Sequence, residues 1–114
     1  MVEMKEKEFL SRIVEHCVRI EETIDGIDKE TFDDDKNIKD IVCFNIFQIG
    51  ELAKHLSVEF VSNYHGVPWQ KIKGMRDIIG HGYGTIGWDR VWFTAISDIK
   101  PLHEYCEQIL NESI

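Results

Sequence analysis

The sequence lacks any apolar run approaching the ~20 residues that span a bilayer. Its first residues, 1–6, are charged where a signal peptide would have an apolar core. These two absences argue against a membrane-spanning helix and a secretory signal, so we expect a cytoplasmic protein. A chain of 114 residues is also too short for two domains, and we expect a single domain over 1–114.

Cysteine is scarce, and its number is odd. Cys17, Cys43 and Cys106 lie far apart in the sequence, and each falls within an apolar helical pattern. We therefore expect reduced core thiols rather than disulfides or metal ligands. The acidic run 33–35 is interpreted as a solvated helix start that supplies an N-cap. No convincing cluster of metal ligands remains, and we expect neither a metal nor a cofactor.

Positive charge is in short supply as well. The chain has 13 Lys and Arg against 21 Asp and Glu, and its formal net charge is −8. Because Lys and Arg make most phosphate contacts, this balance argues against broad, non-specific binding of nucleic acid. A nucleic-acid site is compatible with it only where cations are concentrated locally, for example by pairing two copies of a site; otherwise the partner is a basic protein surface.

Apolar residues recur at helical spacing along most of the chain, and no useful stretch has the period of a strand. A first amphipathic helix is predicted from Phe9, Ile13, Cys17, Ile20, Ile24 and Ile27. Further helices are predicted over about 38–56, from Pro68 to the glycines that begin at Gly80, and from about 88 onward. Pro101 should kink or divide the last helix. The predicted fold class is all-α, an up-and-down bundle of four to five helices.

The helix over 38–56 has almost no polar face in its middle, where the apolar side chains are Ile41, Val42, Cys43, Phe44, Ile46, Phe47 and Ile49. Such a helix must be buried on several sides, and a small domain has few helices to cover it, so we expect a homodimer. Asn45, Gln48 and Glu51 interrupt the run. They either satisfy polar groups in the core, which is favoured for the first two, or line a site; Glu51 needs a cationic partner.

The concentrated chemistry lies between Arg76 and Tyr83. The guanidinium of Arg76 has a rigid fork of donors that suits a phosphate oxygen. Gly80 and Gly82 would let the chain turn, so that the imidazole of His81 returns toward Arg76. Near a helix C-terminus the protonated form of His81 is favoured, and the neutral form is accessible near pH 7, so this residue could act as acid or base.

The neighbouring side chains complete a set of groups for cleaving RNA without a metal. Asp77 could orient Arg76 or His81, and the hydroxyl of Tyr83 could bind phosphate or be modified. A base would remove the 2′-hydroxyl proton, and cations would stabilise the charge on phosphorus as a cyclic phosphate forms. A symmetric dimer would supply two histidines for the two proton transfers. The same four residues also fit a helix cap with a surface ion pair.

Several stretches, in order along most of the chain, resemble the HepT-like branch of the HEPN superfamily: Ile49–Lys54, Pro68–Trp69 with Ile72, Gly74–Asp77, His81, Tyr83, Val91–Trp92 and Asp98–Leu102. The resemblance implies a helical homodimer with a metal-independent ribonuclease site, formed by Arg76 and His81 of both subunits in the cleft between them. It also implies a toxin whose antitoxin is a small MNT-type nucleotidyltransferase, which in some members transfers AMP to the tyrosine equivalent to Tyr83. Many members have Asn at the position of Asp77.

The leading hypothesis is therefore a ribonuclease toxin that acts on RNA. Arg76 would clamp the phosphate, His81 would act as acid or base, and Asp77, Tyr83 and Glu51 would support them. Two alternatives stay open. The chain could be a non-catalytic module that docks a nucleotidyltransferase or a nucleotide through the same cleft, or a helical dimer whose site is inactive.

Overall fold

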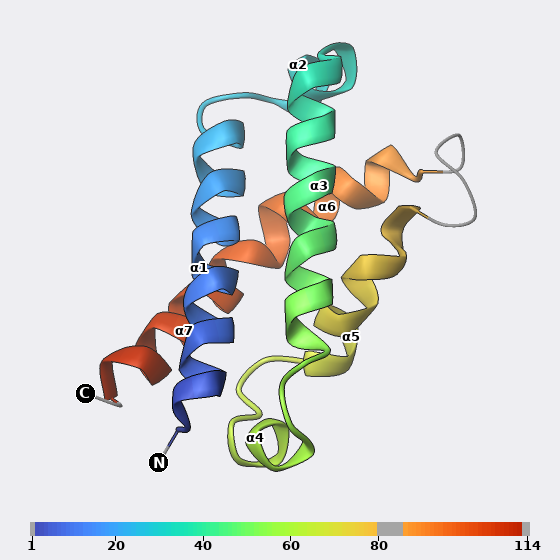
Figure 1. The fold of residues 1–114 in the computed structure, drawn as a ribbon. Coiled ribbons are helices and arrows are strands. Elements are labelled where there is room, and N and C mark those ends of the chain that lie inside the picture. Colours follow the sequence, from blue (N-terminus) through green and yellow to red (C-terminus); the bar gives the residue numbers. More distant parts are fainter. Residues whose placement is uncertain (1, 80–85, 113–114) are drawn as a thin grey trace.

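Two long antiparallel helices form the centre of the protein. The computed structural model describes residues 2–79 and 86–112. In it α1 (Met4–Ile24) and α3 (Lys36–Ala53) lie side by side and run in opposite directions (Figure 1). The fully buried residues of α1 include three of the predicted face, Ile13, Cys17 and Ile20. α3 begins and ends slightly earlier than the predicted 38–56. Its position beside α1 places one of its polar residues between the two helices.

One of those polar residues joins the two helices. Asn45 is only 1% exposed, its Oδ1 lies 2.7 Å from Nδ1 of His16, and its Nδ2 donates to the carbonyl of Ile41 at 2.7 Å. The prediction of a hydrogen-bonded core amide is thus confirmed for Asn45. It is wrong for Gln48, which is half-buried and has no hydrogen-bond partner among the residues that the structure describes.

The acidic run before α3 is a helix start, as predicted. Oδ1 of Asp35 accepts a hydrogen bond from the backbone N–H of Ile38 at 3.1 Å, which satisfies one of the donors that the first turn leaves unpaired. Asp33 instead belongs to a short helix that the sequence did not predict, α2 (Lys29–Asp34). Five polar or charged residues and one buried phenylalanine show no helical period, so pattern alone could not reveal this helix.

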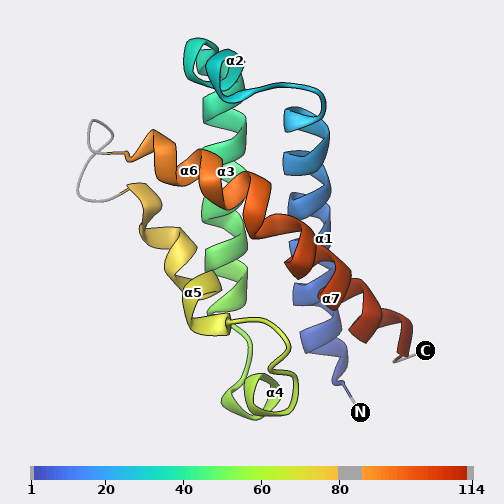
Figure 2. The ribbon, with the colours of Figure 1, turned by 180° about the vertical axis from the view of Figure 1, so that it is seen from behind.

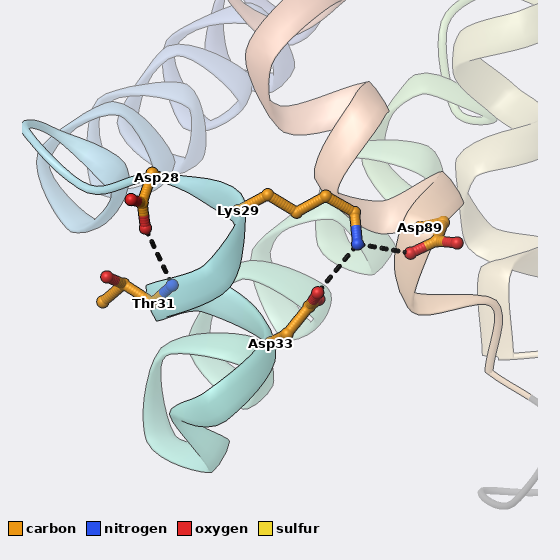
Figure 3. A network of polar contacts seen from close by, with 5 residues as sticks. All are labelled: Asp28, Lys29, Thr31, Asp33 and Asp89. Carbon is orange, nitrogen blue, oxygen red and sulfur yellow. Dashed lines mark hydrogen bonds and ion pairs between the residues drawn. The ribbon is translucent and has the colours of Figure 1, made fainter.

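Polar contacts hold α2 in place at its exposed side (Figure 3). Its N-cap residue, Asp28, accepts a hydrogen bond from the N–H of Thr31 at 2.9 Å, which lowers the pKa of that carboxyl. Nζ of Lys29 lies 2.8 Å from Asp33 and 2.7 Å from Asp89, at the start of α6 (Trp88–Ser97). All three charged side chains of this ion-pair network are well exposed, so it orients α2 more than it stabilises the fold.

The segment that carries Arg76 changes its winding in the middle. After the short α4 (Val58–Asn63), α5 (Trp69–Lys73) begins one residue later than predicted, with Pro68 as its N-cap, and at Gly74 it gives way to a 3₁₀ helix, η1 (Gly74–Ile79). The buried residues of this segment are spaced by three: Trp69, Ile72, Met75 and Ile78. That spacing matches the three residues per turn of a 3₁₀ helix, so one long α-helix would have rotated some of them into solvent.

The last helical segment is divided as predicted from Pro101. α6 ends at Ser97, and α7 (Ile99–Glu112) begins after Asp98. Proline has no N–H to donate to the carbonyl of Ser97, four residues earlier, and its ring would collide with that carbonyl in a continuous helix. Pro101 is tolerated in the first turn of α7, where backbone donors have no partner within the helix.

α7 is fastened along α1 by buried thiols and by one charged contact. Cys17 and Cys106 are fully buried and free, the predicted core thiol Cys43 is buried and free, and burial raises the pKa of each. Nδ1 and Nε2 of His103 each lie 2.7 Å from a carboxylate oxygen, of Glu21 and Glu107. Carboxylates only accept, so this geometry fits the imidazolium. Burial opposes its charge, but the two glutamates outweigh burial and raise the pKa of His103.

The described residues form an all-α bundle, which confirms the predicted fold class. α1 and α3 form an antiparallel pair, α5 and η1 run back along α3, and α6 with α7 crosses the rear of the pair (Figures 1 and 2). Residues 2–79 and 86–112 contain seven α-helices and one 3₁₀ helix rather than four to five helices, because two helices are short and two predicted helices are each divided. None of the described helices combines the length and the apolar character that crossing a membrane requires.

Candidate active site

Arg76 lies on η1, with its side chain 42% exposed beside the C-terminal end of α3. Its backbone is held there by a close approach of the two helices. A Cβ added at Gly50 of α3 would lie 3.1 Å from both Cα and Cβ of Arg76, and closer still to its backbone nitrogen. Only a residue without a side chain allows this contact. Gly50 therefore determines the position of the Arg76 backbone, although the sequence pattern did not indicate this role.

Two carboxylates flank the guanidinium of Arg76. Oε1 of Glu51 lies 3.8 Å from Nη1, and Oδ1 of Asp77 lies 3.7 Å from Nε. Both distances are longer than a hydrogen bond, so these ion pairs orient the arginine and leave its donors available. Asp77 is 74% exposed. The structure thus brings together three of the predicted site residues, and Glu51 has the cationic partner that it was expected to need.

Glu51 holds a second cation as well. Its Oε2 lies 3.0 Å from Nζ of Lys54, the residue that caps the end of α3. The hydrogen bond from Lys54, with the charges of Lys54 and Arg76, lowers the pKa of Glu51 below its usual range. The carboxylate is therefore ionised at neutral pH, and it links the lysine of one helix to the arginine of the other.

Arg76 lines a shallow, open depression whose lining residues, apart from one glycine, have polar or charged side chains: Lys54, Gln70, Lys73, Gly74, Arg76 and Asp77. Three of these side chains are cations and one is a carboxylate. On a chain with a net charge of −8 this is a local concentration of positive charge, of the kind that a phosphate site requires. Lys73 and Gln70 were not singled out from the sequence; the signal that could have found them is that they precede Arg76 by three and by six residues.

His81 and Tyr83, the other two residues of the predicted site, lie outside the described residues. They follow η1 directly in the sequence, after Ile79 and before Ile86. Within 2–79 and 86–112, no group of three or more His, Cys, Asp or Glu side chains is arranged to hold a metal ion. The chemistry that the described part offers is thus anion binding: a guanidinium and two ammonium groups facing one open depression.

Comparison with known proteins gives a consistent result. Residues 13–109 match the family described as Ribonuclease HepT-like. "Putative RNase TTE0752" of Caldanaerobacter subterraneus subsp. tengcongensis is 31% identical over 104 residues, which cover 91% of this chain and 93% of that protein. "Putative RNase MJ0127" of Methanocaldococcus jannaschii is 32% identical over 111 residues, with 91% and 89% covered.

A longer protein of Methanocaldococcus jannaschii, "Gamma-glutamylcyclotransferase and putative RNase MJ0434", is 32% identical over 106 residues. These cover 93% of this chain but only 48% of that protein. No solved structure matches the chain.

Proposed function

The chain belongs to the ribonuclease HepT-like family, and from this membership we propose that it is a metal-independent endoribonuclease and the toxin of a toxin–antitoxin pair. One observation carries the proposal. Lys54, Lys73 and Arg76 share one depression of an otherwise acidic chain, at the point where the sequence motif of Arg76, His81 and Tyr83 begins. A phosphodiester is the ligand that such a cluster favours.

In the proposed reaction, Arg76 binds a non-bridging oxygen of the scissile phosphate and stabilises the charge that develops there. His81 of one copy takes the proton of the 2′-hydroxyl, and the 2′-oxygen attacks phosphorus. A 2′,3′-cyclic phosphate forms as the bond to the 5′-oxygen breaks, and the protonated His81 of a second copy gives its proton to that oxygen. Glu51 and Asp77 hold Arg76 in position. Tyr83 would be the residue that a nucleotidyltransferase antitoxin of the MNT type modifies with AMP, which would place a phosphate where the RNA binds.

The direct test uses the purified chain, a defined RNA and EDTA. We expect cleavage to continue with the divalent ions removed, and the 5′ fragments to end in a 2′,3′-cyclic phosphate, because no step requires a metal-bound water. End-group analysis by mass spectrometry distinguishes this product from a 3′-hydroxyl. Cleavage that stops in EDTA, or no cleavage with or without metal ions, would contradict the proposal.

The proposed site is completed by a second copy of the chain. α3 leaves two large apolar side chains uncovered, Ile41 at 44% and Phe44 at 55% exposed. They share a helix face with Gln48 and Glu51, since the four positions are spaced by three and four. A second copy covering this face would bury the exposed apolar side chains and bring its own Arg76 and His81 close to the first set. This pairing also concentrates positive charge further.

Phe44→Asp should separate such a dimer without unfolding the subunit, because the side chain is exposed and makes no part of the core. We expect the mass in solution, measured by light scattering, to fall from that of two chains to 13.3 kDa, and RNA cleavage to fall with it. Val58→Asp is the matched control, since Val58 is 81% exposed on α4. A monomeric wild type, or a Phe44→Asp variant that stays paired, contradicts this interface.

A further inference from the structure

The depression beside Arg76 extends along the helix that carries it. Gln70, Lys73 and Arg76 are spaced by three and all line its wall. In an α-helix, residues three apart are rotated by about 60° relative to each other, whereas in a 3₁₀ helix they are aligned. Because the winding changes at Gly74, the side chain of Arg76 comes into line with Lys73. Their Cβ atoms are then about 5–6 Å apart, as for neighbours on one helix face.

The opposite wall belongs to α3, where Lys54 projects from the end of the helix. Its ammonium is 3.0 Å from Glu51 and its side chain is 41% exposed. Lys73 differs, because it forms no ion pair or hydrogen bond with any residue that the structure describes. Lys73 is half-buried. Stability poorly explains an ammonium there that pairs with no described carboxylate, since burying a charge without a partner costs free energy.

We propose that Lys73, with Lys54 and Gln70, binds the phosphate adjacent to the one that Arg76 holds, so that the site takes a single RNA strand through at least two successive phosphates. This inference rests on the proposed function and adds a subsite to it. The phosphate that Lys73 binds lies on the N-terminal side of Arg76, over the turn that joins α5 to η1. The phosphate that Arg76 binds lies closer to the end of η1.

The charge distribution favours one strand over a duplex. Proteins that read double-stranded RNA by its shape contact phosphates across two minor grooves and the groove between them. This chain has an excess of acidic residues outside the depression, with 13 Lys and Arg against 21 Asp and Glu in total. A cluster of three cations matches a short stretch of one flexible backbone, and the net negative charge of the rest of the chain would repel a long duplex.

The test measures binding separately from cleavage. The probe is a short 2′-O-methyl RNA strand, which lacks the free 2′-hydroxyl and cannot be cut by transesterification. Its affinity for the whole chain is measured by fluorescence anisotropy between roughly 50 and 200 mM KCl, where lost phosphate contacts appear in the slope of log K against log salt. We expect Lys73→Gln to weaken binding roughly 3–10-fold at low salt and to reduce the slope by about 0.7, the value for one contact to a single strand.

Two variants make the measurement specific. Lys36→Gln removes the same charge from the exposed start of α3, at the other end of the helix from Lys54, and should leave the slope unchanged. Lys73→Arg should restore both affinity and slope. A Lys73→Gln variant with the wild-type slope, or a probe that does not bind at all, overturns the subsite.

The outcomes also separate this inference from the function on which it rests. If the probe binds as expected but unmodified RNA is not cut, the ribonuclease proposal fails and the subsite stands. If RNA is cut but the slope of Lys73→Gln is that of the wild type, the ribonuclease stands and the subsite is discarded.

Discussion

Alanine at His81 should lower the rate of RNA cleavage by about 10²–10⁴-fold, the contribution of a positioned general acid or base. Alanine at Arg76 should lower it by about 10²–10³-fold, as expected when a preorganised charge is removed from the developing oxyanion. Arg76 is 42% exposed, and its ion pairs with described residues, Glu51 and Asp77, are both long, so its removal leaves the core intact. Rates on a defined RNA are compared with thermal melting and mass in solution.

Two arginine variants show whether the effect is specific. Arg12→Ala removes the same charge from the exposed side of α1 and should cut RNA at the wild-type rate. Arg76→Lys keeps the charge but loses the fork of donors, so an intermediate rate is expected. If a folded, dimeric Arg76→Ala protein cuts RNA as fast as Arg12→Ala, Arg76 has no part in the mechanism. A fully active His81→Ala protein would exclude His81 in the same way.

Gly50→Ala should destabilise the fold by roughly 2–3 kcal/mol, which for a domain of this size lowers Tm by about 10–20 °C. The added methyl group would press on the backbone nitrogen, Cα and Cβ of Arg76. Backbone cannot move aside as the end of a flexible side chain can, so η1 must shift away from α3. Where the variant still folds, RNA cleavage should fall as well, because Arg76 moves with its helix.

Gly74→Ala is the matched control for this substitution. No heavy atom lies within 4 Å of the position that its Cβ would occupy, and its φ of −68° is helical. Replacing a glycine in such a position usually stabilises a protein by up to about 1 kcal/mol. Thermal melting of both variants therefore compares a glycine that has no room for a methyl group, Gly50 on α3, with one that has room, Gly74 on η1. Equal Tm values for Gly50→Ala and Gly74→Ala would show that η1 does not rest on Gly50.

The long helices could be predicted because their apolar residues keep one period over many turns. The face of α1 around Ile13, Cys17 and Ile20, and the division of the last helix near Pro101, follow from spacing and from the missing N–H of proline. α2 could not be predicted in this way, because six residues span less than two turns and the helix depends on the Asp28 cap and on the packing of Phe32 against other helices.

The candidate site, too, could be predicted only in part. The sequence by itself determined the all-α class and pointed to Arg76 and Glu51, because helical period and residue chemistry are local properties of the chain. Only the tertiary structure decided that Gly50 lets η1 rest on α3 and that Lys54 and Lys73 face one depression. These depend on how closely two helices approach and on how one of them is wound. Such distances are set by packing between segments that are remote in sequence, and this packing leaves no repeating pattern in the amino-acid sequence.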